Sequence, residues 1–201
     1  DFIDSPGARD MAAALVAGLA AVLGPDTLDL PVSDRWQLLL RTMRKTDPYR
    51  YAEVPFAGRP LNRWLDRAKD FAHQAAGRPA KLFELLETAG RPDYWWDAHF
   101  TLLVPVSVLW LCDFDPLAAM PLTLDFRHDT DSYSHVLGAM GGAVCGEEVF
   151  PLPLRQTVLA RLQADYGESL EDWQQTLAAC QARTQQGSLV ESIEDSRDMG
   201  R

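Results

Sequence analysis

The sequence predicts an all-α fold with many short helices at steep angles rather than a long bundle. Apolar residues recur at helical spacing through most of the chain, and no segment alternates apolar and polar residues as a half-buried strand does. Helix start signals and glycine or proline breaks delimit short segments. The length of 201 residues and the hydrophobic content of 47% indicate one domain with a real core, followed by a tail.

Three helices are expected in the first part of the chain. Ser5-Pro6 is a typical helix start, and the alanine-rich run after it ends before Gly24-Pro25. The second helix is expected over Ser33 to Met43, and the third over Leu61 to Ala76, both with apolar residues at helical spacing. Thr46 to Pro60 contains three prolines and is expected to be a loop.

Six further helices are expected in the second part of the chain. Their expected limits are Lys81 to Thr88, Tyr94 to Cys112, Asp115 to Asp125, Tyr133 to Gly146, Leu154 to Tyr166 and Leu170 to Arg183. The helical domain is therefore expected to span residues 1–187. The polar segment 188–201 is expected to be a disordered tail.

The composition argues against several classes of protein. The formal net charge of −10 repels phosphate backbones, so nucleic acid is not an expected partner. The longest apolar stretch, Phe100 to Cys112, is too short to cross a bilayer, and we find no signal peptide. Cys112, Cys145 and Cys180 are scattered and are expected to be reduced and buried. We therefore expect a cytoplasmic protein without a membrane partner.

The stretch His128 to Ser132 gives the most informative chemical signal. Asp129 and Asp131 place two carboxylates two residues apart, and Ser132 adds a hydroxyl, which are oxygen ligands of the kind that Mg²⁺ prefers. On spacing alone, capping is the more frequent role of such residues at a helix start. Two carboxylates this close repel each other unless a cation or several donors intervene, and this favours a metal site.

The helix after this stretch contains three glycines, Gly138, Gly141 and Gly142. Each costs about 1 kcal/mol relative to alanine inside a helix. We therefore expect the helix to be packed so closely that side chains would not fit. Such packing would give the acidic loop a rigid, buried support.

Other residues give weaker signals. His128-Asp129 has the order of the paired His-Asp in metal-dependent phosphohydrolases, for which His73 and His99 are available as further histidines. The loop Thr46 to Pro60 mixes aromatic rings with flanking arginines, a composition that suits a nucleotide, but a solvated surface loop is the more frequent case. Trp95-Trp96 is expected to pack in the core.

A longer series of motifs surrounds the acidic stretch. Val104-Pro105 precedes an apolar helix, Asp113-Phe114-Asp115 opens a short helix, and the acidic stretch leads into Gly138 to Ala143 and then Gly146 to Pro151. In order and spacing this series resembles the C-terminal pattern of the ADP-ribosylglycohydrolase family, the DraG-like ADP-ribosyl hydrolases. The helix from Ser5 to Gly24 is also similar to an alanine-rich helix of that family, so the resemblance covers residues 5–155 and is strongest near its end.

The resemblance implies an orthogonal all-α domain with two Mg²⁺ ions in its pocket. It also implies hydrolysis of the glycosidic bond between ADP-ribose and a modified protein side chain, or of a related ADP-ribose derivative. Carried over by position, Asp129 and Asp131 would be the catalytic, metal-binding carboxylates and Ser132 the hydroxyl ligand. His128 would lie against the substrate. The implied partners are an ADP-ribosylated protein or an ADP-ribose-type small molecule.

The chain departs from the family pattern at two positions and by one absence. His128 stands where the family has glycine, and Ser132 where it has threonine. The Thr-Asp-Asp type cluster that completes the two-metal site has no counterpart before Asp129. We therefore expect either the C-terminal portion of a longer protein, active only with its N-terminal segment, or a degenerate member. The alternatives are a catalytically silent relative that binds ADP-ribose, a nucleotide or a protein, and a different metal-dependent phosphohydrolase.

Overall fold

The computed structural model describes residues 6–46, 60–90 and 97–180. These residues form helices joined by turns and contain no strand, which confirms the all-α prediction. The chain divides into two compact units, residues 1–149 and residues 150–201. The predicted domain end at residue 187 and the predicted tail at 188–201 lie outside the described residues.

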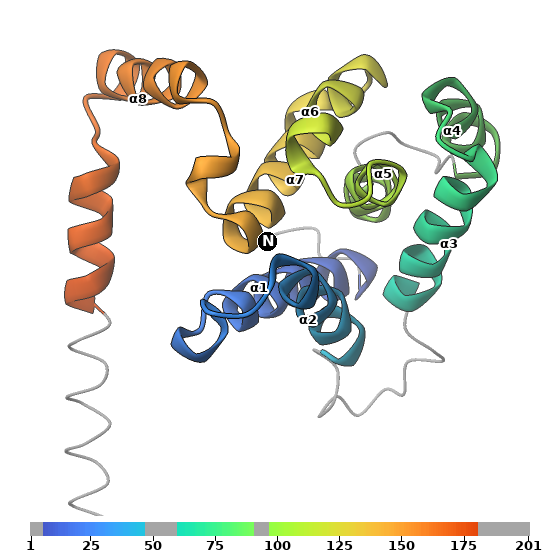
Figure 1. Cartoon of the computed structure of the whole chain (residues 1–201), viewed down its shortest axis with the longest axis horizontal. Helices are drawn as coiled ribbons and strands as arrows, with labels where there is room; N and C mark the ends of the chain where they lie inside the picture. The colour runs from blue at the N-terminus through green and yellow to red at the C-terminus, as the bar shows by residue number, and fades with distance from the viewer. Residues whose placement is uncertain (1–5, 47–59, 91–96, 181–201) are drawn as a thin grey trace, which may run out of the picture. The chain divides into compact units, whose positions relative to one another are not determined.

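The helices of the first unit lie close to their predicted positions (Figure 1). They are α1 (Pro6–Val22), α2 (Val32–Lys45), α3 (Pro60–Ala75), α4 (Pro79–Leu85), α5 (Ala98–Leu111), α6 (Pro116–Asp125) and α7 (Thr130–Cys145). A π-helical turn, η2 (Leu86–Gly90), continues α4, and the 3₁₀ turns η1 (Pro25–Thr27) and η3 (Glu147–Val149) follow α1 and α7. Among the residues that the structure describes, no helix is long and apolar enough to cross a membrane.

α5 is the central helix of the first unit, and Figure 1 shows it nearly end-on between the other helices. Every residue from Leu102 to Leu109 is buried. The hydroxyl of Ser107 donates to the backbone carbonyl of Leu103 at 2.7 Å, which satisfies this polar group inside the apolar interior. Because α1, α3, α6 and α7 all pack against α5, this helix sets the position of the acidic turn described below.

Gly18 permits a close contact between two helices of this unit. A Cβ atom at Gly18 in α1 would lie 2.8 Å from Cγ of Met43 and 3.2 Å from the carbonyl oxygen of Leu39, both in α2. Any larger residue would push the two helices apart. The pair α1 and α2 therefore depends on a small residue at position 18.

α5 begins later than the sequence predicts. The apolar run indicates a start at Tyr94, but Asp97 has extended backbone angles and caps the helix, since its carboxylate accepts from the backbone N–H of His99 at 2.8 Å. Hydrophobic periodicity does not detect such a cap, because the aromatic residues before Asp97 continue the apolar pattern.

Close packing does not explain two of the glycines in α7. A Cβ at Gly138 would meet only Cε of Met120, at an ordinary contact distance of 3.7 Å, and a Cβ at Gly142 would meet no described atom within 4 Å. The expectation that side chains would not fit is therefore wrong at these two positions. The rigid support of the acidic turn comes instead from large buried side chains of α7, among them Tyr133 and Leu137.

The cysteines are less buried than the sequence suggests. None of the three forms a disulfide, but Cys112 and Cys145 are half-buried and Cys180 is exposed. Burial raises the pKa of the Cys112 and Cys145 thiols, which keeps both in the less reactive protonated form.

The second unit contains α8 (Leu152–Tyr166), which starts two residues before its predicted limit. Gly167 ends this helix with a left-handed φ of 69°, and its backbone N–H donates to the carbonyl of Gln163 at 3.0 Å. Residues 170–180 belong to a following helix. No residue from 150 to 180 is buried, so the described part of this unit has no core of its own.

Candidate functional site

The candidate site begins in the turn between α6 and α7, where two consecutive residues have left-handed backbone angles. φ is 69° at Arg127 and 64° at His128, a region that glycine adopts readily and other residues rarely. Such a conformation costs roughly 1–2 kcal/mol per residue with a side chain. Surrounding contacts must therefore hold the turn that carries the chain from Asp125 to Asp129.

The three predicted ligand residues lie together at the start of α7. Asp129 is the N-cap residue, yet its side chain makes no capping hydrogen bond. Asp131 is exposed in the first turn, and Ser132 beside it is half-buried. The helix dipole and the unpaired backbone N–H groups stabilise negative charge at this end of a helix. The turn therefore presents oxygen atoms, and capping does not account for the Asp129 carboxylate.

A cluster of aromatic rings lies beneath this turn. Tyr133 is fully buried in the first turns of α7, and its ring centroid lies 6.1 Å from those of Phe100 and Phe126. The ring of Phe126 also lies 5.3 Å from that of Phe83 in α4. Because four helices contribute to this cluster or flank it, the start of α7 has little freedom to shift.

His128 is held by a residue from a distant part of the chain. Its Nε2 atom lies 2.7 Å from Oε1 of Glu87, and its ring meets the ring of Phe126 edge-on at 5.3 Å. These contacts explain how a residue with a side chain is kept at positive φ here. Glu87 is 41 positions away in sequence, and no local pattern in the sequence indicates that it belongs to this turn.

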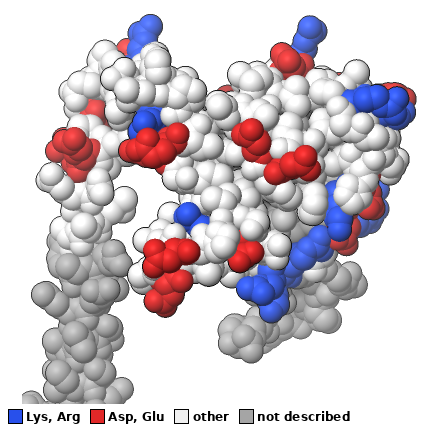
Figure 2. Space-filling view, viewed as in Figure 1, with Lys and Arg blue, Asp and Glu red and all other residues white. Residues whose placement is uncertain are grey.

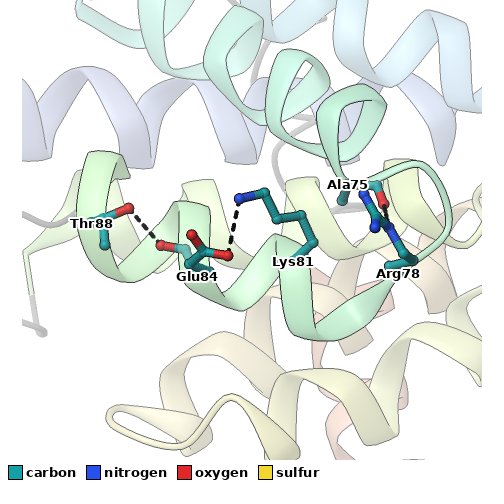
Figure 3. Close-up of polar contacts among 5 residues, drawn as sticks. All are labelled: Ala75, Arg78, Lys81, Glu84 and Thr88. Carbon is teal, nitrogen blue, oxygen red and sulfur yellow. Dashed lines mark hydrogen bonds and ion pairs between the residues drawn. The ribbon is translucent and has the colours of Figure 1, made fainter.

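Glu87 is positioned by α4 and by η2. In Figure 3, Nζ of Lys81 lies 2.9 Å from Oε2 of Glu84, and the hydroxyl of Thr88 donates to the carbonyl of Glu84 at 2.7 Å. At the start of α4, Nε of Arg78 donates to the carbonyl of Ala75 at 3.3 Å. These contacts stabilise both ends of the short segment that carries Glu87 toward His128.

The pKa of the Tyr133 hydroxyl group is affected by the acidic residues of the site. Burial raises the pKa of Tyr133 strongly, and the negative charges of Asp129 and Glu87 raise it further, while a backbone hydrogen bond at Asp129 opposes them. The phenol therefore stays protonated near neutral pH.

The donor atoms suit a hard cation but do not complete its coordination. Two carboxylates and a hydroxyl are suitable ligands for Mg²⁺, which prefers six oxygen atoms in octahedral geometry. Within residues 6–46, 60–90 and 97–180, no three His, Cys, Asp or Glu side chains gather to hold a metal ion. Asp129, Asp131 and Ser132 thus form part of a possible magnesium site, whose other ligands would be water, substrate or further protein oxygens.

Two of the other histidines have partners of their own. His99 contacts the carboxylate of Asp97 through Nδ1 and lies beside the Trp64 ring, and His73 meets the Trp110 ring edge-on at 6.0 Å. His135 is exposed on α7. The structure gives no sign that these residues assist His128 in binding a metal.

The loop predicted over Thr46 to Pro60, whose composition would also suit a nucleotide, lies mostly outside the described residues, as does Trp95-Trp96. Figure 2 shows lysine and arginine side chains along the side of the first unit where α3 lies. Arg44 at the end of α2 contacts Asp66 in α3 at 2.6 Å, and the Arg67 guanidinium lies 5.0 Å from the centre of the Trp64 ring. Arg44 and Arg67 therefore both make contacts within the first unit.

A small apolar groove lies between α1, α5 and α7. It measures about 260 Å³ and is lined by residues that include Leu15, Leu102 and Val136. Val136 lies one helical turn after Ser132 and on the same face of α7. Typical ligand pockets have at least roughly 300 Å³, so the groove would accept only the apolar part of a larger ligand.

Asp10 in α1 is a buried acidic residue that the sequence analysis does not single out. It is only 1% exposed, a degree of burial that is rare for a charged side chain. Its neighbours Met11 and Ala14 are also buried. The helical spacing from Met11 places Asp10 at the edge of the inward face, which is the signal that could have identified it.

Comparison of the chain with protein-family models, curated proteins and solved structures finds no match.

Proposed function

We propose that the turn at the start of α7 holds Mg²⁺ in a site of the ADP-ribosylglycohydrolase type. On this proposal the chain contributes to hydrolysis of the glycosidic bond between ADP-ribose and a modified protein side chain, or of a related ADP-ribose derivative. The main observation behind the proposal concerns Asp129, which lies beside Asp131 and Ser132. Asp129 occupies the N-cap position of α7, but its side chain makes no capping hydrogen bond.

The backbone of the turn gives a second line of support. His128 stands where the ADP-ribosylglycohydrolase pattern has glycine, and its φ of 64° is one that glycine adopts without strain. The backbone at His128 thus has a conformation that suits the glycine of that pattern, which supports the proposal. The contact with Glu87 offsets part of the cost of keeping a histidine there.

The chemistry follows from the donor groups. Asp129 and Asp131 would provide the carboxylates and Ser132 the hydroxyl that hold the ion, and His128 borders the place where a ligand would meet it. When bound, Mg²⁺ supplies a positive charge that positions the ribose hydroxyls and a water molecule. Cleavage at the anomeric carbon develops positive charge on the sugar, as in glycoside hydrolysis, so neighbouring carboxylates stabilise its transition state.

Binding of Mn²⁺ to the full chain tests the proposed metal site. Mn²⁺ prefers the same oxygen ligands as Mg²⁺ and broadens nearby NMR signals. We expect selective broadening of the amides of residues 128–133, and we expect its loss in Asp129→Asn and Asp131→Asn. Asparagine is as good an N-cap as aspartate, so these variants remove charge without removing a possible cap.

Asp125→Asn is the matched control, because Asp125 is an exposed acid at the end of α6. It should leave the broadening unchanged. Broadening that persists in both test variants, or that never reaches the start of α7, would show that the acidic turn is not a metal site.

A second candidate is a catalytically silent protein that binds ADP-ribose or a nucleotide. The absence of a third acidic or histidine ligand in the described residues favours it. Calorimetry with ADP-ribose in Mg²⁺ and in a chelator separates the two functions. Equal affinity in both conditions, together with no release of ADP-ribose from a modified protein, would favour the silent protein.

A phosphohydrolase built on His128-Asp129 receives less support, since Nε2 of His128 is engaged by Glu87. If the protein is such a phosphohydrolase, His128→Ala should abolish cleavage of phosphoesters. If it is an ADP-ribosyl hydrolase, the same variant should only modulate the activity.

A further inference from the structure

A pocket between α2 and the turn that joins α5 to α6 is lined by aromatic rings. It measures about 370 Å³, and its walls include the side chains of Trp36, Trp110 and Phe114 together with that of Asp113. We call it the aromatic pocket. Pockets for small molecules measure roughly 300–1,000 Å³. The aromatic pocket is therefore large enough for a small ligand.

The three rings of the aromatic pocket lie close to one another. The ring centroid of Phe114 lies 5.3 Å from that of Trp36 and 4.7 Å from that of Trp110. The negative face of an aromatic ring attracts a cation within about 6 Å of its centre, and tryptophan does so most strongly. Nζ of Lys69 in α3 already lies 5.2 Å from the centre of the Trp110 ring. A single group inside the pocket can therefore contact more than one ring, and one of these rings already attracts a cation.

An unusual backbone turn places two of the lining residues. φ is 51° at Asp113 and 63° at Phe114, values that are rare for residues with side chains. The backbone N–H of Phe114 donates to the carbonyl of Leu109 at 2.8 Å, which holds the turn against the end of α5. Backbone conformations of this kind are frequent at ligand sites. The turn brings an aromatic ring and a carboxylate to the same pocket.

The charge of the aromatic pocket favours a cation. Among the described residues that line it, Asp113 alone carries a charge, and its side chain is exposed to solvent. A primary ammonium has three N–H donors, and the pocket offers few acceptors for them besides this carboxylate and the polar side chains of Ser33 and Gln37. A quaternary ammonium has no N–H donor to leave unsatisfied. Its methyl groups also suit the aromatic walls.

We propose that the aromatic pocket binds the quaternary ammonium group of a small molecule of about the size of choline. The rings of Trp36, Trp110 and Phe114 would contact the methyl groups, and Asp113 would supply the opposite charge.

This site is separate from the acidic turn and does not rest on the function proposed for that turn. Arg35, next to Trp36 in the chain, donates from Nη2 to the carbonyl of Ala143 at 2.7 Å. Ala143 is near the end of α7, whereas Asp129 precedes its start. With a rise of 1.5 Å per residue, the two ends of this helix are about 20 Å apart. Failure of either proposal therefore leaves the other standing.

Calorimetric titration of the full chain with choline tests the proposal. We expect a Kd of about 1 mM or lower. Neohexanol, the uncharged carbon isostere of choline, should bind at least about tenfold more weakly, because the rings and Asp113 attract the positive charge. Ethanolamine, the primary ammonium analogue, should also bind more weakly than choline. These comparisons need no variant of the protein.

Two variants with matched controls connect the binding to the aromatic pocket. Trp110→Leu keeps an apolar side chain but removes the aromatic face, and it should weaken choline binding at least about fivefold. Trp64→Leu removes a half-buried indole of α3 that does not line the pocket, and it should have no effect. Asp113→Asn should also weaken binding, since asparagine tolerates the left-handed backbone but lacks the charge. Asp125→Asn, at the end of α6, is its control.

Three outcomes would overturn the proposal. The first is that choline does not bind at millimolar concentration, and the second is that neohexanol binds as tightly as choline, as expected of a merely apolar pocket. The third is that a Trp110→Leu variant with unchanged circular dichroism binds choline as well as the wild type. A peptide with trimethyllysine is included in the titrations. Binding of that peptide without binding of choline would contradict a small-molecule ligand and indicate a modified protein instead.

Discussion

His128 combines a left-handed backbone with a side chain that is held in place. The φ of 64° disfavours histidine, but Nε2 of the ring contacts Glu87 and the ring packs on Phe126. The strain of the backbone and the contacts of the side chain therefore oppose each other at one residue.

Substitution at position 128 separates these two effects. His128→Ala keeps the backbone strain and loses the contacts, so it should be the less stable variant. His128→Gly loses the same contacts but relieves the strain, and it should be about 1 kcal/mol more stable than the alanine variant. Urea unfolding of both variants measures the difference. Equal stabilities would mean that the turn relaxes when the ring is removed.

Tyr133 should make the folded chain sensitive to alkaline pH. Burial, aided by the charges of Asp129 and Glu87, raises its pKa above the ordinary value of 10.0. Below about pH 10 the phenol is neutral in both states and stability is unaffected; above it, the unfolded chain loses the proton first. Stability should therefore fall as pH rises past 10, by at most about 1.4 kcal/mol per pH unit from this group. Urea midpoints at about pH 8 and pH 11 measure the fall, and Tyr133→Phe should reduce it.

The candidate residues differ in how far the sequence could reveal them. Asp129, Asp131 and Ser132 are neighbours in the chain, so their spacing alone placed them at one helix start. Glu87 reaches the same turn from another element, and only the folded chain brings it there. Asp10 lies between these cases, because helical spacing indicates its inward position but not its role.

At the scale of the element, glycines in α1 and α7 have opposite packing environments. Gly18 lies where α1 and α2 touch, whereas Gly142 has free space around its Cα atom in the described structure. The sequence alone does not distinguish these two positions, because both are glycines within a helix.

Replacing each glycine by alanine should give changes of opposite sign. Gly18→Ala should destabilise the first unit by about 1–3 kcal/mol, because the new methyl group overlaps Met43 and the backbone of Leu39. Gly142→Ala should stabilise it by up to about 1 kcal/mol, since alanine favours the helix and nothing obstructs it. Thermal unfolding of the two variants checks both signs. Destabilisation by Gly142→Ala would restore the idea that close packing selects glycine in α7.

The helices themselves were largely predictable, and their ends were not. Apolar spacing located α1, α2, α3, α6 and α8 within a few residues. The start of α5 was missed because the cap at Asp97 depends on a hydrogen bond to the backbone, while the residues before it are apolar. The π-helical turn after α4 has no simple sequence signal, although it carries Glu87.

At the scale of the whole molecule, the stabilising core belongs to the first unit. Every buried residue in the described part of the chain lies between Asp10 and Val144. The boundary at residue 149 was not evident from the sequence, because amphipathic helices continue beyond it with a similar pattern.

Residues 1–149 should therefore fold without the second unit. We expect this shortened chain to unfold cooperatively, with a midpoint within a few degrees of that of the full chain, because no described core residue is removed. Differential scanning calorimetry of the two chains makes the comparison. Loss of a cooperative transition would show that the second unit contributes to the core.

The central position of α5 also has a consequence for synthesis on the ribosome. α5 ends at residue 111, and α7, which covers one side of it, ends 34 residues later at residue 145. At an elongation rate of about 5–20 residues per second, α7 is completed about 2 to 7 s after α5. Until then α7 cannot pack against α5, the most apolar segment of the nascent polypeptide. During that interval it is a natural target for chaperones that bind newly made chains.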